Sequence, residues 1–388
     1  MSRPLKIMLS AGEASGDRLG AGLARSLLRL HPGVSLFGMG GDEMADAGVR
    51  LVQHASEVAV VGFVEVIRHL PTIRRAMSRL ESAARAERPD LLVPIDFPDF
   101  NLRLAGRATA AGIPVVYYVS PQVWAWRKGR VAAMRKRVRR MLVLFPFEST
   151  FYEAEGVPAT FVGHPAAAER ERATRTELLP RIGLDPLHPV VALLPGSRVG
   201  EAGRIFPVLI EAARALSGTH PRVQCVVPRA RTIPQGFLER IAEGARVPNV
   251  GIRDDAYPGI LDVADAGAVA SGTATLDAAL AGLPFVAVYR MQALSYLMAK
   301  ALVSVEHVAL PNLIAGARIV PELVQGQFTP GAVLGILSGL LDDPSRAAAS
   351  RLGLLGVRDR LCGDGAFDRA AAAVLDEARQ VCSNRGRA

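Results

Sequence analysis

Two apolar stretches of the chain end on residues suited to acid–base or anion chemistry. Residues 91–95 run directly into Asp96, and residues 190–194 run into a Pro-Gly-Ser-Arg turn that ends at Arg198. A carboxylate at the end of an apolar strand has little water to stabilise its charge, so its pKa tends to rise, which suits a general base. A guanidinium at a strand end can neutralise a departing diphosphate. Since α/β proteins bind ligands beyond the carboxyl ends of their strands, we expect both residues at one cleft between two domains.

Each of these residues also has a structural interpretation. Asp96 could hydrogen-bond a loop, and Asp99 could cap the helix that follows. Arg198 could instead form an ion pair with Glu201 in the next helix. The residue types and their spacing leave both interpretations open.

A second turn of small residues follows the apolar stretch that ends at Ala270. Its sequence, Ser-Gly-Thr-Ala, opens a helix, and backbone amides at a helix N-terminus attract anions. Asp277, one turn further on, could accept a hydrogen bond from a ribose hydroxyl or could simply stabilise the helix start. The candidate substrate-binding residues of this half are Gly196, Ser197, Ser271, Gly272, Thr273 and Ala274, with Arg290 and Asn312 as weaker strand-end and loop candidates.

The first apolar stretch is followed by a glycine-rich turn, residues 12–22, that also opens a helix. It lacks the Gly-Lys-Ser/Thr ending of a P-loop and matches the dinucleotide fingerprint poorly. Glu13, Ser15 and Asp17 are candidates for contacting an acceptor substrate, although Asp17 could instead cap the helix. His164 is expected to be structural. No His, Cys and Asp spacing resembles a metal site.

Both tryptophans of the chain, Trp124 and Trp126, precede eight basic residues within residues 127–140. Aromatic rings beside Lys and Arg suit a membrane interface, a sugar-lipid headgroup or single-stranded nucleic acid. The alternative is a solvated basic helix beside a core aromatic. The candidates for a membrane or acyl-chain surface are Trp124, Trp126, Arg127, Lys128 and Arg130.

Length and composition indicate a folded protein of two domains. The chain has 388 residues, half of them apolar, and its net charge is +9. Residues 1–165 hold 22 Lys and Arg against 15 Asp and Glu, so the positive field belongs to the first half, where it favours anionic partners. Three cysteines without metal spacing fit a reducing compartment. No apolar run approaches the roughly 18–20 residues of a membrane span, so we expect a cytoplasmic protein.

Strand-like and helical stretches alternate along most of the chain, which predicts parallel sheets with helical crossovers. The expected strands are residues 5–10, 34–37, 91–95, 115–119, 141–144, 190–194, 223–227, 268–270 and 285–288. We expect Pro71 to kink or divide a helix over residues 64–87. Residues 166–188 are polar and indicate a connecting segment, and the chain is nearly all helical from Thr329. The predicted domains are 1–165 and 166–388, the second with terminal helices.

Six ordered blocks of sequence resemble the lipid-A-disaccharide synthase family over about residues 5–320. The blocks are 11–17 (AGEASGD), 95–101 (IDFPDFN), 118–126 (YVSPQVWAW), 193–198 (LLPGSR), 270–277 (ASGTATLD) and 310–313 (LPNL). In position, Asp96 matches the family's proposed base, Arg198 its essential donor-site arginine and residues 271–274 its UDP-binding turn. The family usually has Glu where this chain has Asp277, so the ribose contact is the weaker part of the match.

The resemblance implies an α/β protein of the GT-B type, with two Rossmann-like domains whose parallel sheets face a central cleft. It implies an inverting, metal-independent glycosyltransferase that needs no cofactor. The implied partners are UDP-2,3-diacylglucosamine as donor, 2,3-diacylglucosamine 1-phosphate (lipid X) as acceptor, and the anionic cytoplasmic face of the inner membrane of a Gram-negative bacterium. A homodimer is a further possibility, and no nucleic-acid partner is expected.

Two other functions are compatible with parts of the sequence. A UDP-sugar epimerase would use a similar pair of domains and the same small-residue turn, but it would not need a lipid-facing surface. A nucleic-acid-binding protein would account for the positive charge, but not for two ligand turns at strand ends. A product assay with a UDP-sugar and no acceptor separates the first of these from a transferase, and filter binding at moderate salt tests the second.

Overall fold

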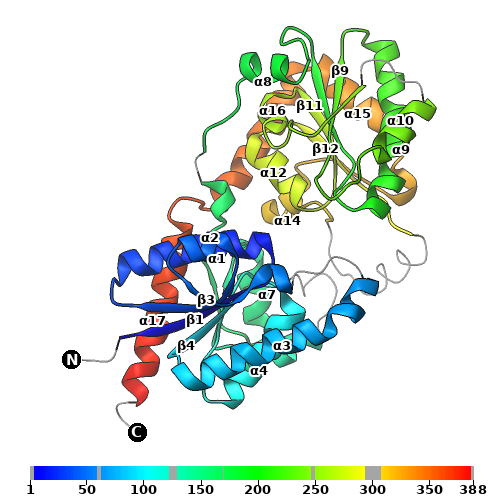
Figure 1. The fold of residues 1–388 in the computed structure, drawn as a ribbon. Coiled ribbons are helices and arrows are strands. Elements are labelled where there is room, and N and C mark those ends of the chain that lie inside the picture. The colour runs from blue at the N-terminus through cyan, green and yellow to red at the C-terminus, as the bar shows by residue number, and fades with distance from the viewer. Residues whose placement is uncertain are drawn as a thin grey trace. The chain divides into compact units, whose positions relative to one another are not determined.

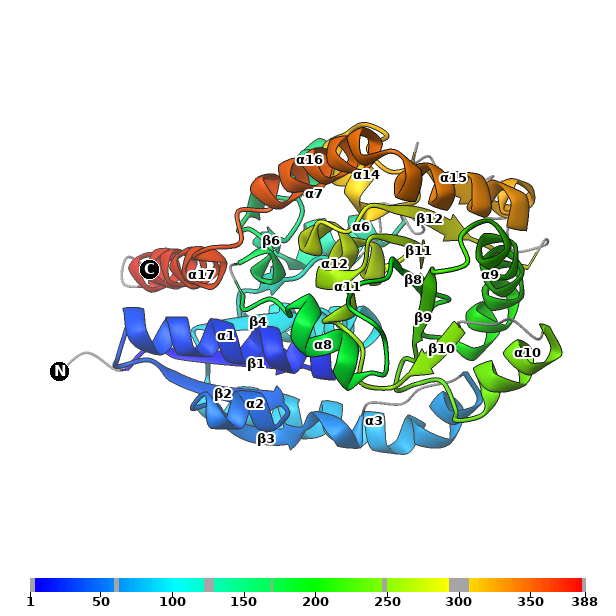
Figure 2. The ribbon, with the colours of Figure 1, turned by 90° about the horizontal axis from the view of Figure 1, so that it is seen from above.

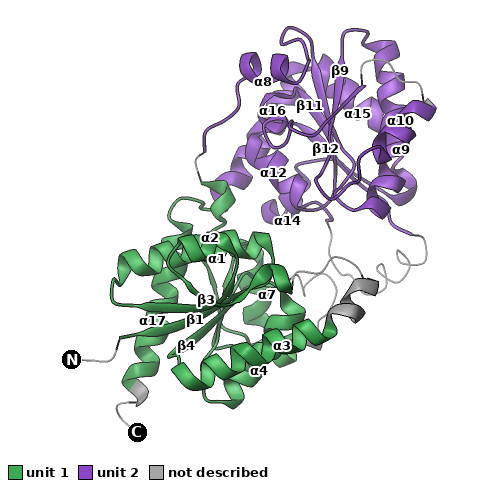
Figure 3. Ribbon diagram, in the orientation of Figure 1, with its two compact units in different colours: residues 1–168, 361–388 green, residues 169–360 purple. Residues whose placement is uncertain are grey.

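The computed structural model of the protein describes residues 4–58, 63–121, 129–168, 170–245, 250–292 and 307–385. The chain divides into two compact units (Figure 3). The first unit contains residues 1–168 and 361–388, and the second contains residues 169–360. Each unit is built on a parallel β-sheet with helices on both faces (Figure 1), which confirms the α/β class expected from the alternation.

The sheet of the first unit has seven strands among the described residues, in the order β3-β2-β1-β4-β5-β6-β7. All of its neighbouring strands pair in parallel. The order reverses between β1 and β4, which places a topological switch point there. The strands are β1 (Lys6–Ala11), β2 (Ser35–Gly40), β3 (Arg50–His54), β4 (Leu91–Ile95), β5 (Val116–Tyr118), β6 (Arg140–Val143) and β7 (Ala159–Phe161).

Alternating side chains of β1 contribute to two separate cores, one on each face of this sheet. Ile7 and Leu9 pack with α1, α2 and α17, whereas Met8 packs with α3, α4, α6 and α7. The helices are α1 (Ala14–Leu30), α2 (Asp42–Asp46), α3 (Phe63–Glu87), α4 (Pro98–Ala110), α6 (Gly129–Arg137), α7 (Pro146–Ala154) and α17 (Ala366–Arg385), with the short turns η1 (Ala55–Glu57) and η2 (Pro165–Ala167). Pro71 lies inside α3, which is one uninterrupted helix, so the expected division at this proline does not occur.

The sheet of the second unit has six strands among the described residues, in the order β10-β9-β8-β11-β12-β13, again with parallel neighbours. Its switch point lies between β8 and β11. The strands are β8 (Val190–Leu194), β9 (Gln224–Pro228), β10 (Val250–Arg253), β11 (Ala266–Ala270), β12 (Phe285–Tyr289) and β13 (Glu322–Val324). The helices are α8 (Arg175–Arg181), α9 (Val199–Thr219), α10 (Phe237–Ala245), α11 (Ile260–Val263), α12 (Thr273–Ala281), α14 (Leu310–Ala315), α15 (Pro330–Asp342) and α16 (Pro344–Arg360), with the short turn η3 (Gln325–Gln327).

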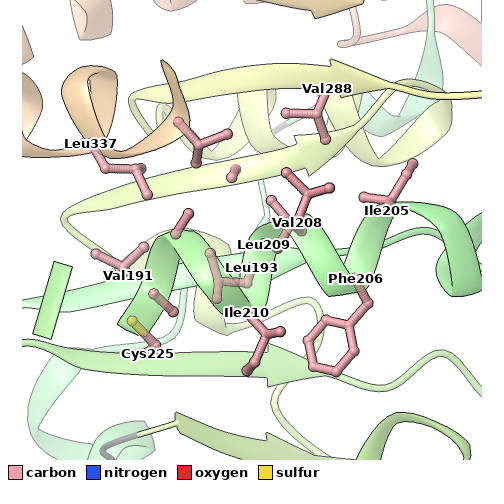
Figure 4. Close-up of a cluster of buried hydrophobic side chains, with 14 of the residues drawn as sticks. Val191, Leu193, Ile205, Phe206, Val208, Leu209, Ile210, Cys225, Val288 and Leu337 are labelled. Atoms are coloured by element: carbon pink, nitrogen blue, oxygen red, sulfur yellow. The ribbon is translucent and has the colours of Figure 1, made fainter. Parts of the chain in front are cut away.

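One core of this unit lies between its sheet and the helices α9, α10 and α15 (Figure 4). Val191 and Leu193 of β8 and Phe206 and Leu209 of α9 are fully buried in it. Complete burial of such a side chain stabilises the fold by about 1.5–3 kcal/mol. The core therefore fixes the start of α9 against the end of β8, where the Pro-Gly-Ser-Arg turn joins them.

The last helix departs from the predicted domain organisation. Instead of completing the second unit, residues 361–388 belong to the first, where α17 packs along α1 (Figure 2). The buried carboxylate of Glu377 accepts hydrogen bonds from Arg139 (3.1 Å) and Arg140 (2.7 Å). The Ser26 hydroxyl donates to Asp368 at 2.7 Å. These long-range contacts, rather than any local signal, decide which unit the helix joins.

The polar segment over residues 166–188 is attached firmly to the second unit. Arg170 donates two hydrogen bonds, of 2.9 and 2.6 Å, to the carboxylate of Asp262. Arg175 donates to the carbonyl of Val263 (2.7 Å) and to Asp265 (3.1 Å). The arginines that mark this segment in the sequence therefore bind it to the body of the unit, and residues 175–181 form α8.

Candidate active site

The candidate residues of the first unit follow the two strands at its switch point. The β1–α1 turn contains Glu13, and the β4–α4 turn contains Asp96. The glycines of the first turn serve close packing, because a Cβ on Gly12 would lie 2.1 Å from the ring of Phe97. The ring of Phe97 thus lies against the β1–α1 turn and brings the two switch-point loops together.

Asp96 has an unusual backbone conformation that neighbouring side chains hold in place. Asp96 and Phe97 both have left-handed φ values, 47° and 50°, which cost an ordinary residue on the order of 1 kcal/mol each. The carbonyl of Asp96 accepts hydrogen bonds from the Tyr117 hydroxyl (2.7 Å) and the Asn101 side-chain amide (2.8 Å). Such strain is retained only where the surroundings impose it, and it is typical of functional sites.

The pKa of Asp96 is raised to about 6. Burial contributes most, because it removes water from the carboxylate, and the negative charge of Glu13 contributes further. A hydrogen bond from the Phe97 amide opposes the rise. A carboxyl group that titrates near 6 is ionised at neutral pH and still binds a proton readily, which is the property of a general base.

Asn101 connects the ends of β1 and β4 from inside α4. Its fully buried side chain donates to the carbonyls of Ser10 (2.9 Å), Ile95 (3.2 Å) and Asp96 (2.8 Å). It accepts a hydrogen bond of 2.7 Å from the Ser10 hydroxyl. One side chain therefore holds both strand ends that form the switch point.

The acidic and hydroxyl candidates near Asp96 have different surroundings. Glu13 and Ser15 are exposed at the start of α1, and Asp99 is exposed in the first turn of α4. Asp17 is buried, and its carboxylate accepts backbone hydrogen bonds at the start of α2, from Gly41 (2.6 Å), Glu43 (3.1 Å) and Met44 (3.1 Å). Asp17, a residue of α1, therefore caps α2. This structural role replaces its assignment as an acceptor-binding residue.

In the second unit, the β8–α9 turn presents Arg198 to solvent. Gly196 has φ 104°, a value that favours glycine, and Arg198 is the N-cap residue of α9. Among the described residues, the guanidinium of Arg198 has no ion pair within 4.0 Å and no hydrogen bond. The alternative pairing of Arg198 with Glu201 is thus not formed.

The β11–α12 turn has the geometry of an anion-binding helix start. Gly272, with φ 150°, precedes α12, and the hydroxyl of Thr275 donates to the Gly272 carbonyl at 2.7 Å. The amides of Thr273 and Ala274 have no partner within the described part of the chain. Ser271 donates to the carbonyl of Val308 at 2.7 Å, so its hydroxyl helps to hold the turn.

Asp277 is partly buried, one turn into α12, and is already hydrogen-bonded. The hydroxyl of Tyr257 donates to its carboxylate. Burial raises the pKa of Asp277, while Tyr257 and the positive charge of Arg170 act in the opposite direction. A ribose hydroxyl would therefore have to share or displace the Tyr257 contact.

Two weaker candidates, Arg290 and Asn312, are hydrogen-bonded inside the second unit, and their expected role in substrate binding stays a prediction. Arg290 donates to the carbonyl of Phe328 at 2.6 Å and lies over its ring, 5.0 Å from the centroid. Asn312 is fully buried and donates to the carbonyl of Val320 (2.9 Å) and to Glu322 (2.8 Å). Its oxygen accepts from the amides of residues 319 and 320, which leaves little free for a ligand.

The aromatic and basic stretch is only partly within the described residues. Trp124, Trp126, Arg127 and Lys128 lie outside them, as does the side chain of Arg130. Three further arginines have internal partners: Arg137 donates to the Leu102 carbonyl (3.1 Å), and Arg139 and Arg140 bind Glu377. Arg135 and Lys136, at the end of α6, are exposed.

His164 has a structural environment. Burial lowers its pKa to about 4, and its Nδ1 accepts a hydrogen bond of 3.2 Å from the Ala166 amide. Within the described ranges, no three His, Cys, Asp or Glu side chains are grouped so that they could hold a metal ion. No helix in that part of the chain is both long and apolar enough to cross a bilayer.

Three residues near the candidate site were missed by sequence reasoning. Glu201 was considered only as an ion-pair partner of Arg198, although its carboxylate lies against Gly196 in the turn before α9. Tyr257 approaches Asp277 from 20 residues away, and no local pattern marks that contact. Glu322 accepts hydrogen bonds from Ala309 and Asn312 at the start of α14, again through a contact that only the fold creates.

Comparison with known families gives a match over most of the chain. The model of the lipid-A-disaccharide synthetase family matches residues 7–353. The lipid-A-disaccharide synthase of Geobacter sulfurreducens is 44% identical over 373 residues, which are 96% of this chain and 97% of that protein. The enzyme of the same name from Myxococcus xanthus is 42% identical over 97% of this chain and 98% of its own length.

Solved structures with low sequence identity share the fold. The glycosyltransferase of kitacinnamycin superposes with a TM-score of 0.64 at 17% identity, over 97% of this chain and 100% of that one. A putative UDP-N-acetylglucosamine 2-epimerase from Listeria monocytogenes gives 0.68 at 12% identity, over 97% and 98%. The calicheamicin glycosyltransferase CalG4 gives 0.58 at 18% identity, over 97% and 98%. The fold is thus of the GT-B type, which transferases and epimerases share.

Proposed function

Because the chain belongs to the lipid-A-disaccharide synthase family, we propose that it transfers 2,3-diacylglucosamine from UDP-2,3-diacylglucosamine to the primary hydroxyl of lipid X. The products are the β-1,6-linked disaccharide 1-phosphate and UDP. The observation that carries the proposal is the family match over residues 7–353, together with identities above 40% along nearly the whole chain. The solved structures of low sequence identity establish the fold, but they do not distinguish a transferase from an epimerase.

In the proposed mechanism, Asp96 is the general base. Its carboxylate accepts the proton of the acceptor hydroxyl as that oxygen attacks the anomeric carbon, and the bond from this carbon to the diphosphate breaks. One displacement inverts the anomeric configuration. The raised pKa of Asp96, near 6, supports this role, as does the backbone geometry that the side chains of Tyr117 and Asn101 maintain.

In the same step, negative charge develops on the departing UDP. We assign its stabilisation to Arg198 and to the first amides of α12, at Thr273 and Ala274. The guanidinium is exposed and has no partner among the described residues, and the helix start concentrates positive potential at the same end of the sheet. Removing one such contact typically costs roughly 3–4 kcal/mol of activation free energy. In this mechanism, Arg198 and the start of α12 supply the positive charge that stabilises the leaving diphosphate, so no divalent cation is needed.

We further propose that the protein associates peripherally with the cytoplasmic face of the inner membrane. Its proposed substrates are acylated, and the exposed Arg135 and Lys136 belong to the basic stretch that follows both tryptophans in the sequence. Each basic side chain near an anionic surface contributes about 1 kcal/mol to membrane association, and salt screens that contribution. Flotation with vesicles containing phosphatidylglycerol should weaken in high salt and when Arg135 and Lys136 are both changed to Gln.

The central test is a product assay. The purified protein is incubated with UDP-2,3-diacylglucosamine and lipid X, and the lipids are analysed by mass spectrometry. The proposal expects a disaccharide phosphate and stoichiometric UDP. Asp96→Asn should lower turnover by about 10²- to 10⁴-fold while UDP still binds. A changed sugar nucleotide formed without acceptor would instead identify an epimerase, and unchanged turnover of Asp96→Asn would exclude Asp96 as the base.

A further inference from the structure

The start of α14 is capped by a carboxylate from another element. Its own N-cap residue is Ala309, whose side chain has no hydrogen-bond acceptor. Amides at such a helix start need an acceptor from elsewhere in the chain. Glu322, the first residue of β13, supplies it: its carboxylate accepts from the amides of Val308 (3.2 Å) and Ala309 (3.0 Å). The contact with Ala309 spans 13 residues of sequence, so the fold creates it.

A buried amide side chain strengthens this contact. Asn312, which is fully buried in α14, donates to the Glu322 carboxylate at 2.8 Å and to the carbonyl of Val320 at 2.9 Å. Its oxygen accepts from the amides of Ile319 and Val320, both at 2.9 Å. Glu322 and Asn312 therefore hold the start of α14 against the segment that leads into β13.

Val308 connects Glu322 to the β11–α12 turn, residues 271–274. Its amide donates to the Glu322 carboxylate, and its carbonyl accepts a hydrogen bond of 2.7 Å from the Ser271 hydroxyl. The amide of Ser271 donates to the carbonyl of Val288 at 2.9 Å. The first residue of the turn is thus attached to β12 through its backbone and to Val308 through its side chain.

We propose that Glu322 is a positioning residue for the β11–α12 turn: by holding Val308, it fixes Ser271 and so places the turn for the diphosphate of the sugar nucleotide. The amides that would bind the diphosphate, those of Thr273 and Ala274, follow Ser271 closely. Hydrogen-bond donors that are fixed in advance need no reorganisation when the ligand binds. This inference rests on the proposed function, and loss of Glu322 should weaken the binding of UDP rather than remove a catalytic step.

The test compares Glu322→Ala with a matched control, Asp265→Ala. The Asp265 carboxylate accepts from the amide of Val190 (2.8 Å) and from Arg175 (3.1 Å), at the opposite end of β11 from the turn. Both variants should lower the melting temperature by a similar few degrees. Glu322→Ala should also raise the Kd for UDP and the KM for the UDP-sugar by about tenfold, whereas Asp265→Ala should leave both within about twofold.

Glu322→Gln separates the geometry of the contact from its charge. The oxygen Oε1 of Glu322 receives the bonds from Val308, Ala309 and Asn312, so a Gln oxygen in its place keeps them. The Kd for UDP should therefore stay within about threefold of wild type. If Glu322→Ala does not fold, Glu322→Asp replaces it with the same expectations, because its carboxylate is one methylene too short to reach the amides.

A double-mutant cycle with Ser271→Ala shows whether Glu322 acts through the turn. Ser271→Ala alone should raise the Kd for UDP about as much as Glu322→Ala, and adding Glu322→Ala to it should change the Kd by less than about twofold. Full additivity, or a Glu322→Ala variant that matches Asp265→Ala in UDP affinity, would overturn the inference while leaving the proposed function intact. A wild-type protein that makes no disaccharide from donor and acceptor would overturn both.

Discussion

The side-chain amide of Asn101 donates a hydrogen bond of 2.8 Å to the backbone carbonyl of Asp96. Because the same amide reaches the carbonyls of Ser10 and Ile95, the position of the proposed base is fixed by a buried polar group that contacts both strands of the switch point. The hydrogen bonds of Asn101 thus stabilise the left-handed backbone conformation of Asp96, which would otherwise relax.

Asn101→Ala should therefore affect both stability and activity. It leaves several buried carbonyls and the Ser10 hydroxyl without their partner, which costs about 2–4 kcal/mol of unfolding free energy. It also allows Asp96 to move, so kcat should fall by about tenfold or more. Urea unfolding and steady-state kinetics measure the two effects. Ser10→Ala, which loses the single 2.7 Å bond to Asn101, is the control and should cost about 1 kcal/mol.

The rate should depend on pH through Asp96. With a pKa of about 6, the base is ionised above that pH, so kcat should fall about tenfold per pH unit below it. Glu13→Gln removes a negative charge that raises this pKa, and the acid limb should move to lower pH. Ser15→Ala, in the same turn, should leave the limb in place. An acid limb that is unaffected by Glu13→Gln would argue against Asp96 as the titrating group.

Asp96 should also make the fold less stable above about pH 6 than in acid. Its folded-state pKa lies above the ordinary value of 3.8, so the folded state binds the proton more tightly. That stabilisation is complete below pH 3.8 and is lost as the pH rises through about 6. Asp96→Asn should consequently be more stable than wild type at pH 8, by about 1–3 kcal/mol, with the difference shrinking towards pH 4. Thermal unfolding at both pH values measures this.

Asp17→Ala should destabilise the first unit without a specific effect on acceptor binding. It removes a buried carboxylate that satisfies the amides of Gly41, Glu43 and Met44. The expected loss is about 1–3 kcal/mol of unfolding free energy. The exposed Asp99 is the control, and Asp99→Ala should cost less than about 1 kcal/mol. An increase in the KM for lipid X with unchanged stability would restore Asp17 as a substrate residue.

Activity should survive removal of divalent cations. In the proposed mechanism, Arg198 and the start of α12 stabilise the leaving diphosphate, so dialysis against EDTA should change kcat by less than about twofold. The assay should be repeated with added Mg²⁺ to separate an effect on vesicles or substrate micelles from one on the protein. A loss of activity that only Mg²⁺ restores would require a cation in the mechanism.

The central strands could be predicted from the sequence, whereas the edge strands could not. Both outer strands of each sheet, β3 and β7 in the first and β10 and β13 in the second, were missed. A central strand such as β8 is buried on both faces and appears as an unbroken apolar run. By contrast, every residue of β10 is only partly buried, and its sequence, Val-Gly-Ile-Arg, carries no clear pattern.

The candidate site was predictable to the extent that it depends on strand ends. Asp96 and Arg198 directly follow buried strands at the two switch points, so the local sequence was enough to place them at strand ends. The internal roles of Asp17, Arg290 and Asn312 depend on partners in other loops, and no residue type reveals whether a polar side chain faces a ligand or a neighbouring carbonyl.

The return of α17 to the first unit has a consequence for how the protein is made. The ribosome completes the whole second unit before it synthesises the helix that covers α1. Until residues 366–385 have been synthesised, the apolar surface of α1 that receives Ala370 and Val374 is not covered by α17. A nascent polypeptide stalled before residue 361 should therefore contain a folded second unit and an incompletely folded first unit. Chaperones should bind the exposed apolar surface of that first unit.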